Sequence, residues 1–231
     1  ITAYTSNLQF GFGLAITDNY AMVGCYSSKK TFIFARDTST DTWSTTAVAT
    51  IDGYDDQSAF GRNCAMTDDY ALVGAYGVSK VFVFARDTSK DTWGTTAVAT
   101  IDGYTDQSGF GLVLSMSENY AVVGTETAGT AFIFSLTSTT AVASITGYTT
   151  HAGFGMAVDM TDNYAIVGAS TVGKAFIFAR DASSGTWGTT AVATIDGYDD
   201  QSGFGSGVSI TDNYAVVGAS GAKTAFIFKR D

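Results

Sequence analysis

Short apolar runs alternate with turn-forming segments along the whole chain. In its last part these runs are Thr190–Ile195, Gly205–Ile210, Tyr214–Gly218 and Ala225–Phe228. Each is rich in Val, Ile, Phe or Ala and is bounded by Gly, Asp, Asn or Ser, which is the pattern of β-strands joined by turns. No segment shows sustained helical periodicity and the chain has no proline, as expected where sheet hydrogen bonding is uninterrupted. The pattern predicts an all-β protein.

The same pattern occurs five times. Each copy begins with a Phe-Gly pair, has a Tyr ten residues after the Phe and a Gly fourteen residues after it. The pairs are Phe10-Gly11, Phe60-Gly61, Phe110-Gly111, Phe154-Gly155 and Phe204-Gly205, spaced by 50, 50, 44 and 50 residues. A fixed period of this length is typical of a repeat architecture. Since composition does not change along the chain, we expect a single repeat domain over residues 1–231.

Four strands in about 50 residues make one blade of a β-propeller, since such a sheet must bury its faces against neighbouring sheets. The joint at Thr211-Asp212-Asn213-Tyr214 recurs in similar form in every copy. Asp or Asn there would take the left-handed conformation of a tight hairpin. We therefore predict a propeller of about five four-stranded antiparallel blades. A parallel solenoid is the alternative, but its coils are usually shorter and lack this hairpin.

The two ends of the chain fall at the same point of the repeat. Ile1-Thr2-Ala3-Tyr4 aligns with Ile195-Asp196-Gly197-Tyr198, and the chain ends just before a segment equivalent to Ala182–Thr194. The last blade is thus expected to be incomplete. Either the natural chain continues, or one blade closes with three strands, or another molecule fills the open edge, which would favour polymerisation. The residues expected at this assembly edge are Ile1, Thr2, Ala3, Tyr4, Phe226 and Phe228.

The repeat resembles the FG-GAP family, the β-propeller repeats also found in the integrin alpha head. The resemblance is carried by Phe204-Gly205, the strand Val208–Ile210, the segment Tyr214–Ser220 and the strand Ala225–Phe228. The Trp187 strand with Ile195-Asp196-Gly197 completes the unit, and every copy conforms in outline. The resemblance implies a propeller that serves adhesion or interaction.

Three departures limit what the resemblance implies. Family propellers often have seven blades, whereas this chain has at most five copies. The Pro of the family's Gly-Ala-Pro is absent. The spacing in Asp196-Gly197-Tyr198-Asp199-Asp200 does not match the calcium loops of integrin repeats, so calcium binding is not implied.

Composition narrows the classes of partner. The formal net charge of −10 is the opposite of the basic footprint that nucleic-acid binding requires. No apolar run approaches the length of a membrane-spanning helix.

Cys25 and Cys64 are the only cysteines. We interpret them as buried free thiols, with a disulfide between them as the alternative in an oxidising compartment.

Repeated residues are expected to be structural, because a catalytic group is needed only once. Arg36, Arg86, Arg180 and Arg230 occupy one repeated position. Trp43, Trp93 and Trp187 recur in three copies and are interpreted as packing residues, with stacking on sugar rings as the alternative. The sequence thus predicts weak candidate ligand-binding residues at these three tryptophans.

Non-repeated polar residues do not form a recognisable catalytic set. His151 is the only histidine and has no Ser or Cys motif beside it. An enzyme would need His151 or Glu126 to meet Arg62 in a pocket, and nothing in the sequence favours this. We therefore expect no enzymatic activity and no catalytic residue.

Acidic loops follow the Ile-Asp-Gly motif in several copies. Equivalent loops of a propeller lie on one face, so they could hold a hard cation such as calcium weakly. The candidate ligands are Asp52, Asp55, Asp56, Asp196, Asp199 and Asp200. The alternative is turn chemistry, because Asp and Gly suit such loops. No other cofactor is expected.

The leading hypothesis from the sequence is a non-enzymatic structural or interaction protein located outside the cell or on its surface. It would act in adhesion or self-assembly through its loops and open sheet edge, with another protein or its own copies as partner. The alternative is a carbohydrate-binding lectin with repeated sites between blades.

Overall fold

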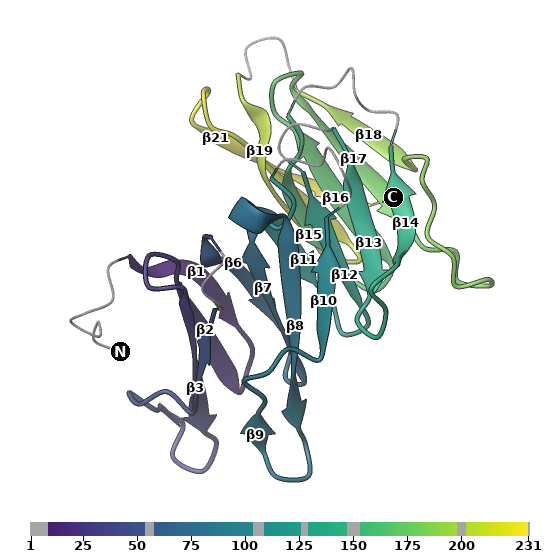
Figure 1. Cartoon of the computed structure of the whole chain (residues 1–231). Coiled ribbons are helices and arrows are strands. Elements are labelled where there is room, and N and C mark those ends of the chain that lie inside the picture. The colour runs from purple at the N-terminus through teal and green to yellow at the C-terminus, as the bar shows by residue number, and fades with distance from the viewer. Residues whose placement is uncertain are drawn as a thin grey trace. The chain divides into compact units, whose positions relative to one another are not determined.

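The computed structural model describes residues 9–53, 58–103, 109–125, 129–146, 153–197 and 202–230 (Figure 1). The chain divides into two compact units, Ile1–Tyr104 and Thr105–Asp231, and each is described by itself. The prediction of one domain over residues 1–231 stays a prediction. None of the helical segments in the described ranges has the length and hydropathy that a membrane crossing requires.

The first unit contains two antiparallel sheets, one for each of the first two copies of the repeat. In both sheets the third strand carries two short segments on its outer edge. The strands of the first sheet are β1 (Phe10–Ile16), β2 (Tyr20–Cys25), β3 (Lys30–Asp37), β4 (Thr42–Trp43) and β5 (Ala49–Asp52). The second sheet has β6 (Phe60–Met66), β7 (Tyr70–Ala75), β8 (Lys80–Asp87), β9 (Thr92–Trp93) and β10 (Ala99–Asp102), with a 3-10 turn at Tyr76–Val78.

The second unit contains the other three copies as three sheets. The first has β11 (Val113–Met116), β12 (Tyr120–Gly124), β13 (Ala131–Ser135) and β14 (Ala141–Ile145). The next has β15 (Phe154–Met160), β16 (Tyr164–Ala169), β17 (Lys174–Ala179) and β18 (Ala193–Asp196). The last has β19 (Phe204–Ile210), β20 (Tyr214–Ala219) and β21 (Thr224–Lys229). The predicted all-β class, the antiparallel four-strand pattern and the incomplete last sheet are confirmed within the described residues.

The outer edge of β3 in the first sheet is occupied by two short strands, β4 and β5, with a turn between them. Ser44 Oγ donates a hydrogen bond to the Thr46 carbonyl at 2.6 Å and accepts one from the Thr46 N–H at 3.1 Å. This local turn takes the backbone away from β3 between β4 and β5. The outer strand is therefore split into a Trp-bearing piece and an Ala-Thr-Ile-Asp piece.

The hairpins at the Thr-Asp-Asn joints are present, but their predicted mechanism is wrong. No Asp or Asn in these joints is among the described residues with positive φ. Instead Thr17 Oγ1 accepts hydrogen bonds from the N–H groups of Asn19 and Tyr20 at 3.2 and 3.0 Å. Thr161 and Thr211 make the same two contacts in their hairpins. The threonine hydroxyl holds the turn, as in other Ser/Thr turns.

Exposed aspartates shape a second type of turn after the third strand. Asp87 accepts hydrogen bonds from the backbone N–H and the hydroxyl of Ser89 at 3.0 and 2.6 Å. These bonds, together with Lys90, lower the pKa of Asp87 to about 2. Asp181 is held in the same way by Ser183 and Ser184, and its pKa is also lowered to about 2. The sequence interpretation of the repeated Asp as a turn residue is confirmed at these positions.

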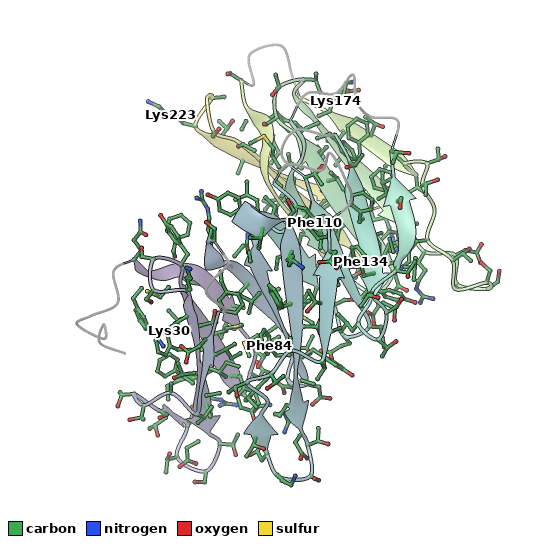
Figure 2. The ribbon with its side chains drawn as sticks, in the orientation of Figure 1. Lys30, Phe84, Phe110, Phe134, Lys174 and Lys223 are labelled. Atoms are coloured by element: carbon green, nitrogen blue, oxygen red, sulfur yellow. The ribbon has the colours of Figure 1, made fainter. Side chains whose placement is uncertain are left out.

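The Phe of four of the five Phe-Gly pairs lies in the core of its own sheet, whereas Phe10 is partly buried. Phe60, Phe110, Phe154 and Phe204 are all fully buried. Phe60 meets Phe84 of the third strand edge-on with ring centroids 6.4 Å apart, and Phe110 meets Phe134 at 6.2 Å (Figure 2 labels Phe84, Phe110 and Phe134). Such aromatic pairs add stability beyond the area that they bury.

The Gly of three Phe-Gly pairs forms a bulge at which neighbouring sheets approach closely. Gly61, Gly155 and Gly205 have φ values of +82°, +89° and +87°, which side chains rarely adopt. The carbonyl of each lies against the glycine fourteen residues after the preceding Phe. These glycines are Gly24, Gly124 and Gly168, where an added Cβ would lie 2.0, 2.0 and 2.1 Å from the carbonyl oxygen. The two repeated glycines are therefore the two halves of one contact between sheets.

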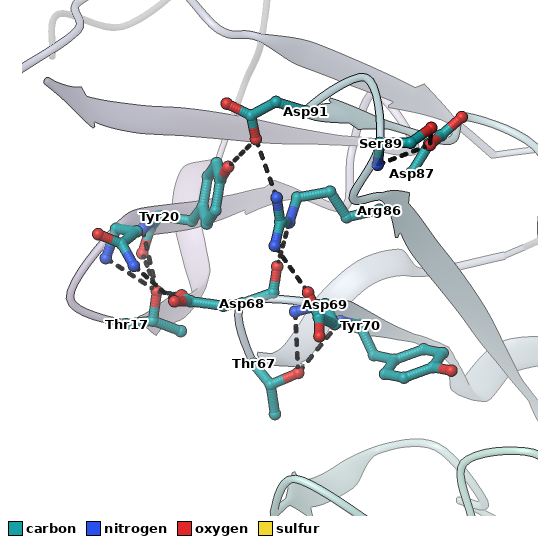
Figure 3. A network of polar contacts seen from close by, with 11 residues as sticks. Thr17, Tyr20, Thr67, Asp68, Asp69, Tyr70, Arg86, Asp87, Ser89 and Asp91 are labelled. Carbon is teal, nitrogen blue, oxygen red and sulfur yellow. Dashed lines mark hydrogen bonds and ion pairs between the residues drawn. The ribbon is translucent and has the colours of Figure 1, made fainter.

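A polar latch joins the same sheets at their hairpins (Figure 3). Thr17 Oγ1 and Asn19 Nδ2 of the first sheet both donate to the carboxylate of Asp68 in the second sheet, at 2.5 Å each. In the second unit, Ser117 and Asn119 donate to Asp162 at 2.6 and 2.8 Å. Thr161 and Asn163 donate to Asp212 at 2.8 and 3.2 Å. Each hairpin thus binds the Asp of the next one.

An aromatic slot completes the contact between the first two sheets. The ring of Trp93 meets Tyr20 edge-on at 5.4 Å, and the Arg86 guanidinium lies 5.5 Å from the Tyr20 ring. Tyr20 donates its hydroxyl to Asp91 at 2.7 Å, and Arg86 binds Asp69 and Asp91 at 2.7 and 2.9 Å (Figure 3). Burial and the Asp91 contact raise the pKa of Tyr20 to about 12. The repeated arginine is structural here, as the sequence suggested.

Both cysteines are free and buried. Cys64 faces the first sheet within the same core cluster as Tyr20 and Trp93. Burial raises the pKa of the Cys64 thiol to about 12, which disfavours the reactive thiolate. The interpretation as buried thiols is confirmed.

We expect Gly168→Ala to destabilise the second unit by about 2 kcal/mol or more, because the new Cβ would overlap the Gly205 carbonyl. Gly207→Ala is the matched control, since a Cβ at Gly207 has no neighbour within 4 Å and the equivalent residue of the preceding sheet is Ala157. Its effect should stay within about 0.5 kcal/mol. Urea unfolding of both variants measures the difference. Equal losses in the two variants would contradict the sheet-to-sheet contact.

Tyr20→Phe is expected to lower the free energy of unfolding by about 1 kcal/mol near neutral pH, through loss of the hydrogen bond to Asp91. The pKa of Tyr20 is raised from 10.0 to about 12 in the folded protein. Its contribution is therefore complete below pH 10 and is lost as the pH rises from about 10 towards 12. Unfolding curves of both proteins across that range measure this loss. A wild-type advantage that is constant with pH would contradict it.

Candidate functional site

The last pair of sheets contains the aromatic slot without its tryptophan. Tyr164 has its usual arginine, since the Arg230 guanidinium lies 4.9 Å from the Tyr164 ring and donates to its hydroxyl. In the preceding pair the equivalent Tyr120 also meets Trp187 edge-on at 5.5 Å. A tryptophan in the equivalent place would follow Arg230 by seven residues, as Trp187 follows Arg180. The chain as given ends before that position.

A cavity of about 490 Å³ lies at this slot. Its lining includes Tyr164, Ile177, Ala193, Ile195, Ile210 and Phe228. In the preceding pair, the equivalent side chains form one buried cluster with Trp187. They are Tyr120, Ile133, Ala143, Ile145, Met160 and Phe178. The cavity therefore has the walls of a tryptophan site that is filled elsewhere in the same unit.

The cavity is bordered by an open strand edge. β21 pairs with β20 along Thr224–Lys229, and no other described strand pairs with its second edge. Phe226 and Phe228 on β21 are half-buried, whereas the equivalent Phe176 and Phe178 are buried. In the preceding sheet β18 pairs with β17 at this edge. Within the described residues β21 is thus the outer strand of its sheet and lies next to an apolar cavity, and an outer strand is a template for strand addition.

Polar groups surround the mouth of the cavity. Thr211, Asp212, Lys229 and Arg230 contribute to its lining. The Asp212 carboxylate is already bound by Thr161 and Asn163. A ligand at this site would therefore meet an apolar interior, one arginine stacked on a tyrosine, and backbone donors and acceptors of β21.

The three tryptophans predicted as weak ligand-binding residues do not form an exposed row. Trp93 and Trp187 are only 7 and 6 % exposed and fill the aromatic slots. Trp43 is 36 % exposed on the first sheet. The packing interpretation therefore holds for Trp93 and Trp187, because burial leaves their faces closed to a sugar ring. The lectin alternative is left with Trp43.

The predicted acidic loops lie only partly within the described residues. Asp52 and Asp196 form ion pairs with Lys30 and Lys174 of the adjacent strand, and Lys80 binds Asp102 in the same way at 2.6 Å. Asp55, Asp56, Asp199 and Asp200 lie outside the described residues. Within the described ranges no group of three metal-ligating side chains occurs. Calcium binding by these loops stays a prediction, and the two described aspartates already have lysine partners.

The other predicted site residues are separated or not described. Of the assembly edge, Phe226 and Phe228 lie on β21 as expected, whereas Ile1, Thr2, Ala3 and Tyr4 are outside the described residues. His151 and Glu126 are also outside them. Arg62 lies between aromatic rings, 5.1 Å from both Phe12 and Tyr76. Arg62 is thus placed in an aromatic stack on the first unit.

The cavity is not predicted by the repeat pattern, although the distribution of tryptophans along the sequence is related to it. Five tyrosines follow the Phe-Gly pairs at the same spacing, but the equivalent tryptophan occurs in only three copies. Matching each tyrosine with the tryptophan of the next copy pairs Tyr20 with Trp93 and Tyr120 with Trp187, and leaves Tyr70, Tyr164 and Tyr214 without a tryptophan in this sequence. The shortage of tryptophans relative to tyrosines indicates an unfilled aromatic slot only once the contact between Tyr20 and Trp93 is known.

Solved structures of propellers are similar to this chain. A WD40 β-propeller domain of Doa1 matches with a TM-score of 0.61 and 10 % identity, over 94 % of this chain and 63 % of that one. A Bacteroides uniformis protein, whose proposed activity is that of a 6-phosphogluconolactonase, matches with a TM-score of 0.65 and 15 % identity, over 96 and 68 %. The computationally designed Ika4 protein matches with a TM-score of 0.59 and 20 % identity, over 81 and 100 %.

These similarities, at low sequence identity, show the fold alone. The predicted β-propeller fold is confirmed by them. No protein-family model matches the chain, and no curated protein matches it. The resemblance to FG-GAP repeats stays a prediction. The chain is an all-β protein with the fold of a β-propeller.

Proposed function

We propose that the protein is a non-enzymatic structural or interaction protein that accepts a β-strand from another protein chain at the edge of β21. The observation that carries the proposal is the cavity at Tyr164 beside β21, the outer strand of the last described sheet. Adhesion or self-assembly outside the cell or on its surface is the setting that we propose, in line with the sequence resemblance. A partner strand would add main-chain hydrogen bonds to β21 and a large side chain to the cavity.

The aromatic slots that contain a tryptophan indicate which kind of segment the partner would supply. In the second sheet Trp93 pairs with Arg86, and the strand Ala99–Asp102 then pairs with β8. The same chain segment thus supplies both the aromatic side chain and the edge strand. We propose that the β21 site takes an extended segment of this kind, with a tryptophan a few residues before an alternating Ala-Thr-Ile sequence. A small sugar would use neither the strand edge nor the full depth of the cavity.

Peptide binding tests the proposal. A fluorescent peptide with the sequence of Asp91–Gly103 should bind the protein, and replacing its tryptophan with alanine should weaken binding about tenfold or more. Ala193→Leu in the protein should abolish binding, because Ala193 lines the cavity and is exposed there. Thr194→Leu is the matched control, since the next side chain of a strand points to the other face.

Fluorescence anisotropy and circular dichroism of the four combinations separate the outcomes. Binding that is lost in Ala193→Leu and kept in Thr194→Leu, with both variants folded, supports strand addition at the cavity. No binding by the wild-type protein, or equal binding by both variants, would refute the site.

A further inference from the structure

One arginine of the chain departs from the repeat. The position two residues after each Phe is held by Phe12, Arg62, Leu112, Met156 and Ser206. The other arginines, Arg36, Arg86, Arg180 and Arg230, share a different position. The fold of a sheet does not require an arginine at the position of Arg62, because the other copies form their sheets without it. Arg62 is therefore a candidate for a role that the protein needs only once.

Three aromatic rings surround the Arg62 guanidinium. Its central carbon lies 5.1 Å from the ring centroids of Phe12 and Tyr76 and 5.7 Å from that of Tyr26. Phe12 and Tyr26 also meet edge-on, with their centroids 4.9 Å apart. A guanidinium at these distances is attracted by the negative faces of the rings. The cluster is internal to the first unit, since it joins residues of the first sheet to residues of the second.

The two tyrosines depart from the repeat together with the arginine. Tyr26 and Tyr76 are each the sixteenth residue after the Phe of their copy. At this position the other three copies have Glu126, Ser170 and Ser220. The aromatic side chains at this position thus occur only in the two copies of the first unit, which are the copies that contact Arg62.

Strained backbone supports the same cluster. Gln9 and Ala59 have φ values of +64° and +62°, which are costly for residues with a side chain. In the second unit the equivalent residues are Gly109, Gly153 and Gly203. The Gln9 side chain donates a hydrogen bond to the Tyr26 hydroxyl at 2.5 Å, and the Ala59 carbonyl accepts one from the Arg62 backbone N–H at 3.2 Å. Strain of this kind is concentrated at binding sites.

The guanidinium has more donors than the surrounding rings can use. It carries five N–H donors in one plane. Among the described residues, the Arg62 side chain donates one hydrogen bond, from Nη1 to the Tyr76 hydroxyl at 3.3 Å. The Tyr76 hydroxyl accepts this bond and keeps its own O–H as a donor. The Arg62 and Tyr76 side chains are both partly exposed, so a small ligand can approach them.

We propose that Arg62 binds a carboxylate group, with the Tyr76 hydroxyl as an additional donor. Two parallel N–H groups of a guanidinium match the two oxygens of a carboxylate, and the three rings hold the guanidinium in place for this contact. A carboxylate suits the site better than a phosphate, because the net charge of −10 opposes a doubly charged ligand more strongly. The site goes beyond the proposed strand binding and shares no residue with the cavity beside β21.

NMR spectroscopy of the arginine side chains tests the site. The chain has five arginines, and the Nε–H signal of Arg62 is the one that disappears in Arg62→Met. A single paired contact gives millimolar affinity at best, so sodium acetate is added up to about 100 mM. Acetate should shift the Arg62 signal about fivefold more than sodium chloride does at equal ionic strength, because chloride cannot accept a pair of parallel hydrogen bonds. Equal shifts with the two salts would refute the site.

Variants separate carboxylate recognition from charge and from packing. Arg62→Lys keeps the charge but lacks the planar pair of donors, so acetate binding, followed at the backbone amides of the first unit, should weaken about fivefold or more. Tyr76→Phe keeps the ring and removes the O–H donor, and it should weaken binding about threefold. Arg36→Lys is the matched control at the repeated arginine position and should bind acetate like the wild type. Unchanged binding in Arg62→Lys would show that only charge is recognised and would refute the proposal.

Further probes identify the source of the carboxylate. Glucuronate presents it on a sugar ring, and N-acetyl-aspartate amide presents it as an acidic side chain. Tighter binding of either than of acetate supports the site and assigns its ligand. Tighter binding of inorganic phosphate than of acetate would overturn the assignment to a carboxylate. The peptide test at β21 is independent of these results, because Ala193→Leu should leave acetate binding unchanged.

Discussion

The architecture of this protein depends on one close approach, between a glycine in the second strand of a sheet and the Phe-Gly carbonyl of the next sheet. At Gly24, Gly124 and Gly168 there is no room for even a methyl group. The approach fixes the distance between sheets, and that distance brings the Thr-Asp-Asn hairpins within hydrogen-bonding range. It also forms the slot in which Trp93 meets Tyr20 and Trp187 meets Tyr120. The glycine contact therefore sets the distance between sheets at which the hydrogen bonds of the polar latch and the tryptophan–tyrosine contact of the aromatic slot form.

The aromatic slot links strand pairing to packing between sheets. Its tryptophan lies on the outer edge of one sheet, where it pairs with the repeated arginine, and its ring is buried against the tyrosine of the preceding sheet. One segment thus stabilises two sheets. Beside β21 no described segment occupies this position, and there the described residues form an apolar cavity next to the outer strand of the last sheet. This coupling is the reason for proposing a strand that carries a large aromatic side chain as the ligand of the cavity, since such a segment supplies both the strand and the aromatic ring in the filled slots.

Much of the fold was readable from the sequence because its determinants are local. Apolar runs and turn residues predicted the strands, and the repeated Phe and Gly marked the positions that each sheet requires. The prediction for the hairpins is wrong in its mechanism, because the Thr17 hydroxyl, which accepts two backbone N–H groups, holds the turn without a left-handed Asp or Asn. The cavity was not predicted, because the pairing of Tyr20 with Trp93 joins residues of different copies, and periodicity within a copy does not show it. Likewise the lysine partners of Asp52 and Asp196 lie across a strand pair, 22 residues away in the sequence.

The two ends of this repeat array differ from those of a typical solenoid or repeat domain. Terminal repeats usually carry a polar outer face, because a polar cap keeps the array soluble and stops it from growing. Here Leu14 and Ile16 at one end and Ile227 at the other are as apolar as their buried equivalents and are exposed instead. The sequence at these positions therefore follows the interior pattern and not a capping pattern. The apolar pattern is set by the contact between sheets, in which the equivalent residues Cys64, Met66 and Ile33 are buried, and the same pattern is kept on sheets for which the described residues show no such contact.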